Sequence, residues 1–168
     1  MNLIRNSLNL QKKVNAELDS TDTRILELMQ AHARISNVDL ARELQMAPSA
    51  VLERVKKLEQ RKVILDYRAV LNPAAVDQKL LAFIFIKATD GLVQGKAGLA
   101  LAKIPQVQEV HHIAGEDCYL VKVRTTDSAS LMELMREKFG KIPNILSTRT
   151  TIVLETVKED QKLVIPKS

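Results

Sequence analysis

The chain of 168 residues carries 25 Lys and Arg against 20 Asp and Glu, a formal net charge of +5, and 46% of its residues are apolar. This length and composition suit one or two small domains with packed cores. The single cysteine, Cys118, excludes a disulfide framework and a multi-cysteine zinc module, and it indicates a reducing compartment. No apolar run approaches the roughly 20 residues of a membrane helix, and we find no signal peptide, so we expect a soluble cytoplasmic protein.

The first third of the chain has the pattern of three helices. Residues 1–17 are polar and weakly patterned, and we interpret them as an N-terminal arm. Asp19 is suited to cap a first helix, and Ser36 followed by Asp39 resembles a capping box at the start of a second. A proline is tolerated at the first position of a helix, which predicts a third helix over Pro48–Arg61.

The third predicted helix has two different faces. Its apolar stripe, which we expect to be buried, consists of Val51, Leu52, Val55 and Leu58. The opposite face is basic, because the window 48–68 contains six Lys or Arg and only three Asp or Glu.

After Lys62 the apolar period changes from 3.6 to 2. Residues 63–71 alternate as in a β-ribbon, and three helices followed by a ribbon are the order of a winged helix-turn-helix. We therefore place a winged helix-turn-helix domain at 18–66, a hinge or linker at 67–78 and a second domain at 79–168.

The second predicted domain alternates strand and helix patterns. Strands are expected at 80–87, 107–114, 119–124 and 145–157, and helices at 92–103 and after Asp127. The order βαββαβ predicts an antiparallel ferredoxin-like sheet with both helices on one face, which makes the whole chain α+β. An uncovered sheet face and free edges favour oligomerisation.

The basic face of the third helix, with the predicted wing, is a candidate DNA-binding surface. The residues assigned to it are Ser49, Ala50, Arg54, Lys56, Lys57, Arg61 and Arg68. Small side chains allow close approach to base edges, Arg54 reaches a base edge or a phosphate, and the remaining cations suit phosphates of double-stranded DNA. A merely solvated basic helix is the alternative. No aromatic platform accompanies the patch, which argues against single-stranded nucleic acid.

Five potential ligands or nucleophiles occur close together: His111, His112, Glu116, Asp117 and Cys118. Adjacent histidines on a strand point to opposite faces, so we expect no metal site. Cys118 and His111 lack a third catalytic group, so we expect no catalytic residue and no cofactor.

The loop Gly115–Tyr119 has two interpretations. Its carboxylates and backbone N–H groups are able to bind the ammonium and carboxylate groups of an amino acid. The alternative is an ordinary hairpin turn with a glycine at positive φ.

Several segments taken together carry a family resemblance. They are Leu18–Leu26, Arg34–Ala41, Pro48–Glu59, Ala69–Pro73, Ser147–Lys158 and Lys162–Ile165. Over about residues 18–165 the chain resembles the Lrp/AsnC (leucine-responsive, feast/famine) family of transcription regulators. Lys62 stands where a glycine often ends the recognition helix in this family, and a left-handed conformation at this lysine would cost roughly 1 kcal/mol of strain.

The resemblance implies a DNA-binding domain joined to an amino-acid-binding (RAM-type) regulatory domain in a nucleoid-associated regulator that is not an enzyme. It also implies homodimers that assemble to octamers and an amino-acid effector, with leucine and methionine as candidates. Carried over by position, the effector site comprises Ile113, Ala114, Gly115, Glu116, Asp117, Cys118, Tyr119, Thr148 and Thr150. Two other functions remain open: an architectural, chromosome-compacting DNA-binding protein, and an enzyme or metabolite binder.

Overall fold

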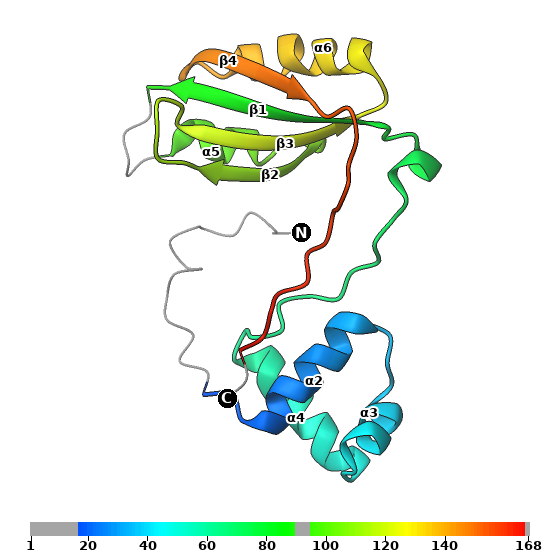
Figure 1. Ribbon diagram of the computed structural model, residues 1–168. Coiled ribbons are helices and arrows are strands. Elements are labelled where there is room, and N and C mark those ends of the chain that lie inside the picture. Colours follow the sequence, from blue (N-terminus) through cyan, green and yellow to red (C-terminus); the bar gives the residue numbers. More distant parts are fainter. Residues whose placement is uncertain (1–16, 90–94, 167–168) are drawn as a thin grey trace. The chain divides into compact units, whose positions relative to one another are not determined.

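The computed structural model describes residues 17–89 and 95–166. The expected arm, apart from residue 17, and the first residues of the expected helix 92–103 lie outside the described residues. The described residues form two units, one made of 17–70 with 159–166 and the other lying within 71–158 (Figure 1). In neither unit is any described helix both long enough and apolar enough to cross a membrane.

The helical unit contains three helices, α2 (Ser20–Ala31), α3 (Asn37–Leu44) and α4 (Pro48–Gln60). The predicted starts are confirmed. Asp19 Oδ1 accepts the amide N–H of Asp22 at 2.7 Å, Ser36 caps α3 through its hydroxyl, and Pro48 occupies the first turn of α4.

The core of the helical unit is built from one stripe of each helix. Its buried members are Ile25, Leu40, Ala41, Val51, Val55 and Leu58. The prediction that Leu52 is buried is wrong, because 39% of this residue is exposed. Val51, Val55 and Leu58 already complete an i, i+4, i+7 stripe, and Leu52 falls beside it.

The helix α4 ends on a left-handed residue, Lys62. Lys62 has φ of 60°. Its amide N–H donates to the carbonyl of Glu59 at 3.0 Å, and the amide of Val63 donates to the carbonyl of Leu58 at 2.9 Å. These two bonds form a Schellman motif, in which glycine is the usual left-handed residue.

The predicted β-ribbon over residues 63–71 is wrong. This segment is extended after the turn at the end of α4, but it belongs to no strand of the described chain. A ribbon needs two paired strands, and the alternating pattern supplied one segment without a second to pair with it in the chain. The helical unit is therefore a helix-turn-helix followed by an extended segment.

The second unit is a four-stranded antiparallel sheet with helices on one face (Figure 1). Its main elements are β1 (Leu80–Ala88), α5 (Lys96–Leu101), β2 (Val107–His112), β3 (Tyr119–Thr125), α6 (Ser128–Glu137) and β4 (Ile145–Ile152), with 3-10 turns at Pro73–Val76 and Phe139–Lys141. The strand order β2-β3-β1-β4 confirms the predicted ferredoxin-like βαββαβ fold. Residues of α5 and α6 share one core with β1 and β3.

Two strands are shorter than expected. β2 ends at His112 instead of residue 114, and β4 ends at Ile152 instead of residue 157. Ile152 pairs with Ala82, so only the first two residues of β1 remain beyond that pair. The amide of Val153 donates one further backbone bond, to the carbonyl of Leu81 at 2.9 Å, and this bond lies next to the first residue of β1. The pairing of β4 therefore ends where its partner strand begins.

The C-terminal tail, which lies within the second domain predicted at 79–168, returns to the helical unit. Residues 159–166 belong to the helical unit. The side-chain amide of Gln30 donates to the carbonyl of Leu163 at 3.1 Å and accepts the amide N–H of Leu163 at 2.8 Å. One glutamine thus satisfies both backbone groups of a tail residue, as a neighbouring strand would.

Candidate functional site

The outward side of α4 lies opposite its buried stripe. Ser49, Glu53 and Lys56 follow one another at i, i+4 and i+7 and are all exposed. Ala50, beside Ser49, is half-buried. On this side of α4, short side chains therefore lie at the N-terminal end and longer, charged side chains lie further along the helix.

The cations of this surface differ in their partners. Lys57 pairs with Glu53 at 2.8 Å and Arg68 pairs with Asp66 at 3.0 Å, and both pairs are exposed. The side-chain ammonium groups of Lys56 and Lys62 have no hydrogen-bond or ion-pair partner among the described residues. Exposed ion pairs contribute about 0–1 kcal/mol, so an incoming phosphate is able to displace them.

The structure places Arg54 and Arg61 on a different side of α4. Arg54 Nη1 donates to Asp19 Oδ2 at 2.7 Å and to Asp22 Oδ1 at 2.8 Å. Arg61 Nη2 donates to the backbone carbonyl of Glu17 at 3.0 Å. Both side chains thus contact the start of α2 or the residue before its N-cap, whereas the sequence predicts a base edge or a phosphate as the partner of Arg54.

Sequence reasoning missed Leu52 as a member of the outward face. It lies three residues after Ser49 and four before Lys56, so it shares their side of the helix. An apolar side chain on a groove-facing helix suits the methyl group of thymine. The sequence signal was available: Val51, Val55 and Leu58 follow the i, i+4, i+7 spacing of a buried stripe, and Leu52 falls outside that spacing.

The loop between β2 and β3 is a closed hairpin connection. The amide of Ile113 donates to the carbonyl of Cys118 at 3.0 Å, and the amide of Cys118 donates to the carbonyl of Ile86 on β1 at 2.8 Å. Gly115 has φ of 155°, which L side chains rarely adopt. These bonds and this φ are those of a hairpin turn, which exposes Ala114, Gly115 and Glu116.

Asp117 and Arg149 form the charged part of this region. Arg149 Nη2 donates to Asp117 Oδ2 at 3.2 Å, and the guanidinium carbon lies 4.1 Å from the centre of the Phe85 ring. Stacking on an aromatic ring orients the guanidinium while leaving its edge free for hydrogen bonds. The pair places opposite charges side by side at the surface of the sheet.

The strand register divides the expected effector residues between two faces. Arg149 is paired with Phe85, whereas Thr148 is paired with the core residue Ile86. Residues opposite one another in a ladder share a face, so Thr148 and, two residues on, Thr150 lie on the helix side. Asp117 contacts the other face through Arg149.

Tyr119 is a core residue. It is 3% exposed, and a Cβ added at Gly98 would lie 2.7 Å from its Cε1. The ring of His112 stacks on that of Tyr119 with 5.0 Å between their centres. This ring fixes one end of the hairpin, and its packing leaves little of its surface for a ligand.

The two histidines confirm the predicted alternation. His111 Nε2 lies 3.0 Å from Glu109 Oε2, and Lys122 Nζ is 3.4 Å from the other oxygen of that carboxylate. These neighbours, His111 first, lower the pKa of Glu109. His112 faces Tyr119 on the opposite side of the strand. Within 17–89 and 95–166 no three His, Cys, Asp or Glu side chains form a group suited to a metal ion.

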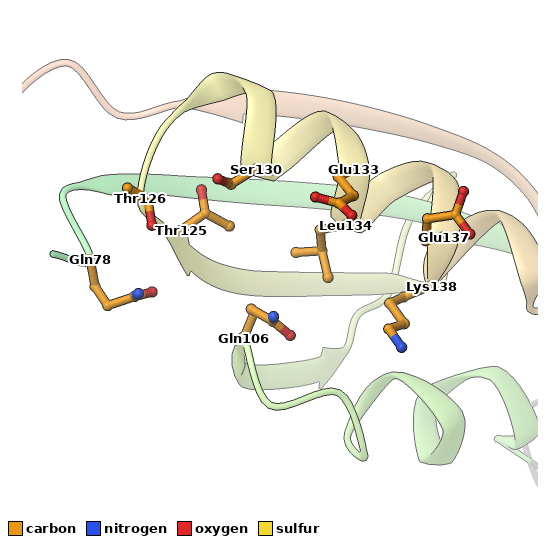
Figure 2. A pocket seen from close by; sticks show the side chains of 9 residues that line it. All are labelled: Gln78, Gln106, Thr125, Thr126, Ser130, Glu133, Leu134, Glu137 and Lys138. Carbon is orange, nitrogen blue, oxygen red and sulfur yellow. The ribbon is translucent and has the colours of Figure 1, made fainter. Parts of the chain in front are cut away.

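A separate cavity of about 320 Å³ lies beside α6 (Figure 2). Its lining is mainly polar and consists of Gln78, Gln106, Thr125, Thr126, Ser130, Glu133, Leu134, Glu137 and Lys138. None of the expected effector residues lines it, so the cavity and the hairpin are distinct candidate sites for a small molecule.

Comparison with known domains also divides the chain into a helical and a sheet part, and it differs in placing residues 159–163 with the sheet. Residues 18–59 match the AsnC-type helix-turn-helix domain, and residues 81–163 match the Lrp/AsnC ligand binding domain. The first match covers α2, α3 and most of α4, and the second begins in β1 and extends beyond β4.

Full-length relatives are similar to both units together. The leucine-responsive regulatory protein of Haemophilus influenzae is 37% identical over 162 residues, which is 93% of this chain and 95% of that protein. Its Escherichia coli K12 counterpart is 36% identical over 157 residues, with 92% and 96% covered.

Solved structures agree. A Neisseria meningitidis transcriptional regulator in complex with L-methionine superposes with a TM-score of 0.81 at 27% identity, covering 88% of this chain and 96% of that one. A feast or famine regulatory protein from Mycobacterium tuberculosis, also complexed with L-methionine, gives a TM-score of 0.79 at 32% identity, with 88% and 99% covered. The chain therefore belongs to the Lrp/AsnC family of transcriptional regulators, which are DNA-binding proteins with an amino-acid-binding domain and not enzymes.

Proposed function

We propose that this regulator reads specific DNA sequences by placing the outward side of α4 in the major groove. The observation that carries the proposal is the exposed row Ser49, Glu53 and Lys56 on a helix whose opposite side is fully packed. Small residues at its N-terminal end permit close approach to base edges. Lys56 and Lys62 supply cations for phosphates, and Lys57 and Arg68 join them when their exposed carboxylate partners are displaced.

Salt-dependent binding tests this placement. We expect Lys56→Ala to weaken binding to all duplexes and to lower the slope of log K against log salt by about 0.9, the value for one phosphate contact. Lys103→Ala is the matched control, because it removes the same charge from an exposed position in the other unit. Equal effects of the two substitutions would reject α4 as the DNA-binding surface.

Selection of duplexes from a random pool separates a regulator from an architectural protein. A sequence-specific regulator enriches one motif, arranged as two half-sites about one helical turn or a multiple apart when two copies bind. A chromosome-compacting protein binds duplexes of the pool without enriching any sequence motif. We expect a motif.

We also propose that an amino acid binds at the hairpin between β2 and β3. Asp117 and Arg149 present a carboxylate and a guanidinium 3.2 Å apart, which matches the ammonium and carboxylate of an amino acid. Glu116 and the backbone of Ile113, Ala114, Gly115 and Cys118 flank Asp117 in the chain. Relatives named leucine-responsive, and structures that contain L-methionine, support leucine and methionine as the first effectors to test.

Calorimetric titration with both amino acids tests the location. Asp117→Asn is expected to weaken binding on the order of tenfold, since it removes one charge-assisted interaction. Glu133→Gln removes a carboxylate from the lining of the cavity in Figure 2 and is expected to leave binding unchanged. The reverse pattern would move the effector site to that cavity.

The uncovered face of the sheet is proposed to form a homodimer, and dimers to assemble to octamers in the cytoplasm at the nucleoid. Phe83, Phe85 and Leu120 share this face by register and are only partly buried in the single chain. Phe83→Glu is expected to give monomers in sedimentation experiments, because a carboxylate would be buried between the copies. An unchanged mass would exclude this face.

A further inference from the structure

We propose that Arg54 is a positioning residue of the recognition helix: it binds Asp19 and Asp22 at the start of α2 and does not contact DNA. This inference rests on the proposed reading of DNA by α4. It assigns to an arginine of the recognition helix a role that its charge and location in the sequence do not suggest.

The first observation is the geometry of the cluster, which we call the α2–α4 clamp and define as Asp19, Asp22 and Arg54. A single nitrogen, Arg54 Nη1, donates to one carboxylate oxygen of Asp19 at 2.7 Å and one of Asp22 at 2.8 Å. The second oxygen of Asp19 accepts the amide of Asp22 at 2.7 Å. The clamp therefore joins the N-cap of α2 to the middle of α4.

Burial is the second observation. Asp22 is 8% exposed, and a carboxylate at this depth needs a partner to remain ionised. Removing one member of such a pair leaves an uncompensated charge, whereas an exposed pair costs little to break. Capping of α2 and the Arg54 guanidinium both lower the pKa of the Asp19 carboxyl, so this carboxylate is available to Arg54 at neutral pH.

The third observation is the direction in which Arg54 leaves the helix. Val51, three residues before it, and Leu58, four residues after it, are both buried. Arg54 therefore borders the packed side of α4 and not the row of Ser49 and Lys56. Arg61, seven residues on, extends the same side and donates to the carbonyl of Glu17 at 3.0 Å.

Asp19 both caps α2 and binds Arg54, so the clamp fixes α4 to the start of α2. A helix in the major groove recognises bases only if its orientation is fixed to within a fraction of an ångström. Loss of the clamp frees α4 to shift against α2 while the phosphate-binding lysines remain. The affinity for the recognised DNA sequence then falls, whereas the affinity for unrelated DNA is unchanged.

The test uses the full-length protein, a duplex that wild type selects from a random pool, and a shuffled duplex of equal length. Arg54→Gln and Asp19→Asn are expected to weaken binding to the selected duplex by roughly tenfold each, and the double variant no more than either alone. Asparagine still caps α2, so Asp19→Asn removes the charge of the clamp and keeps the cap. Binding to the shuffled duplex is expected to stay within twofold.

The sign of the Asp19→Asn effect decides between positioning and contact. If Arg54 bound DNA, removing an acid that competes for it would strengthen binding, and Arg54→Gln would lower the salt slope by about 0.9. Either result overturns the proposal. Glu53→Gln is the matched control: it removes a negative charge from the outward side of α4, outside the clamp, and is expected to strengthen binding to both duplexes.

Two readouts keep the test independent of folding and of the proposed function. A variant that is partly unfolded loses affinity for both duplexes by the same factor, so an unchanged ratio of the two affinities would overturn the positioning role. Failure of the proposed function appears earlier, as a wild-type protein that selects no duplex at all.

Discussion

Replacing Lys62 with glycine is expected to stabilise the helical unit. Lys62 holds φ of 60° in the Schellman motif that ends α4, and both backbone bonds of that motif are formed. A left-handed conformation costs a residue with a Cβ about 1–2 kcal/mol. Glycine avoids this cost but loses about 0.5–1 kcal/mol more conformational entropy on folding. The net gain is about 0.5–1 kcal/mol, and the expected rise in Tm is about 2–8 °C.

Thermal and urea unfolding followed by circular dichroism measure this gain in the full-length protein. Lys62→Ala is the matched control, because it removes the same charge while keeping the Cβ that causes the strain. The expected order of stability is glycine above lysine, with alanine close to lysine. Equal stability of the glycine and alanine variants would refute the backbone argument and assign the effect to charge.

Three further outcomes are expected. Gly98→Ala places a Cβ 2.7 Å from the ring of Tyr119, and overpacking of this kind costs about 1–3 kcal/mol, measured by urea unfolding. Asp127→Ala removes the N-cap of α6 and lowers the free energy of unfolding by about 1 kcal/mol, measured in the same way. Burial and the carboxylate of Glu59 raise the pKa of Tyr67 to about 12. Since the unfolded chain ionises near pH 10, the helical unit loses stability as pH rises from about 10 to 12, and Tyr67→Phe abolishes that part of the loss.

Most secondary structure could be predicted because it depends on local residues. The caps at Asp19, Ser36 and Asp127, and the proline that opens α4, are signals contained within one helical turn. The left-handed Lys62 stands at a family position that usually carries glycine. The order of strands and helices then suffices for the fold.

The roles of individual side chains depend on distant contacts and were harder to predict. Arg54 has its partners 32 and 35 residues earlier in the chain, and no local sequence pattern predicts these contacts. The end of β4 depends on the length of β1, and the tail is bound by a residue 133 positions away. Positive charge on a helix therefore predicts a DNA-binding surface, but it does not show which of the cations are already paired with carboxylates of the same chain.

The contact between Gln30 and Leu163 has a consequence for how the protein is dissected. Because the tail returns to the helical unit, the sheet unit is inserted between two parts of its neighbour's sequence, and between residues 17 and 166 the chain passes from one unit to the other twice. A fragment that stops at residue 70 lacks the peptide that pairs with Gln30, and removing the last ten residues strips a piece from the DNA-binding half without touching its helices. Tags and truncations after residue 158 therefore alter the unit that contains α2, α3 and α4.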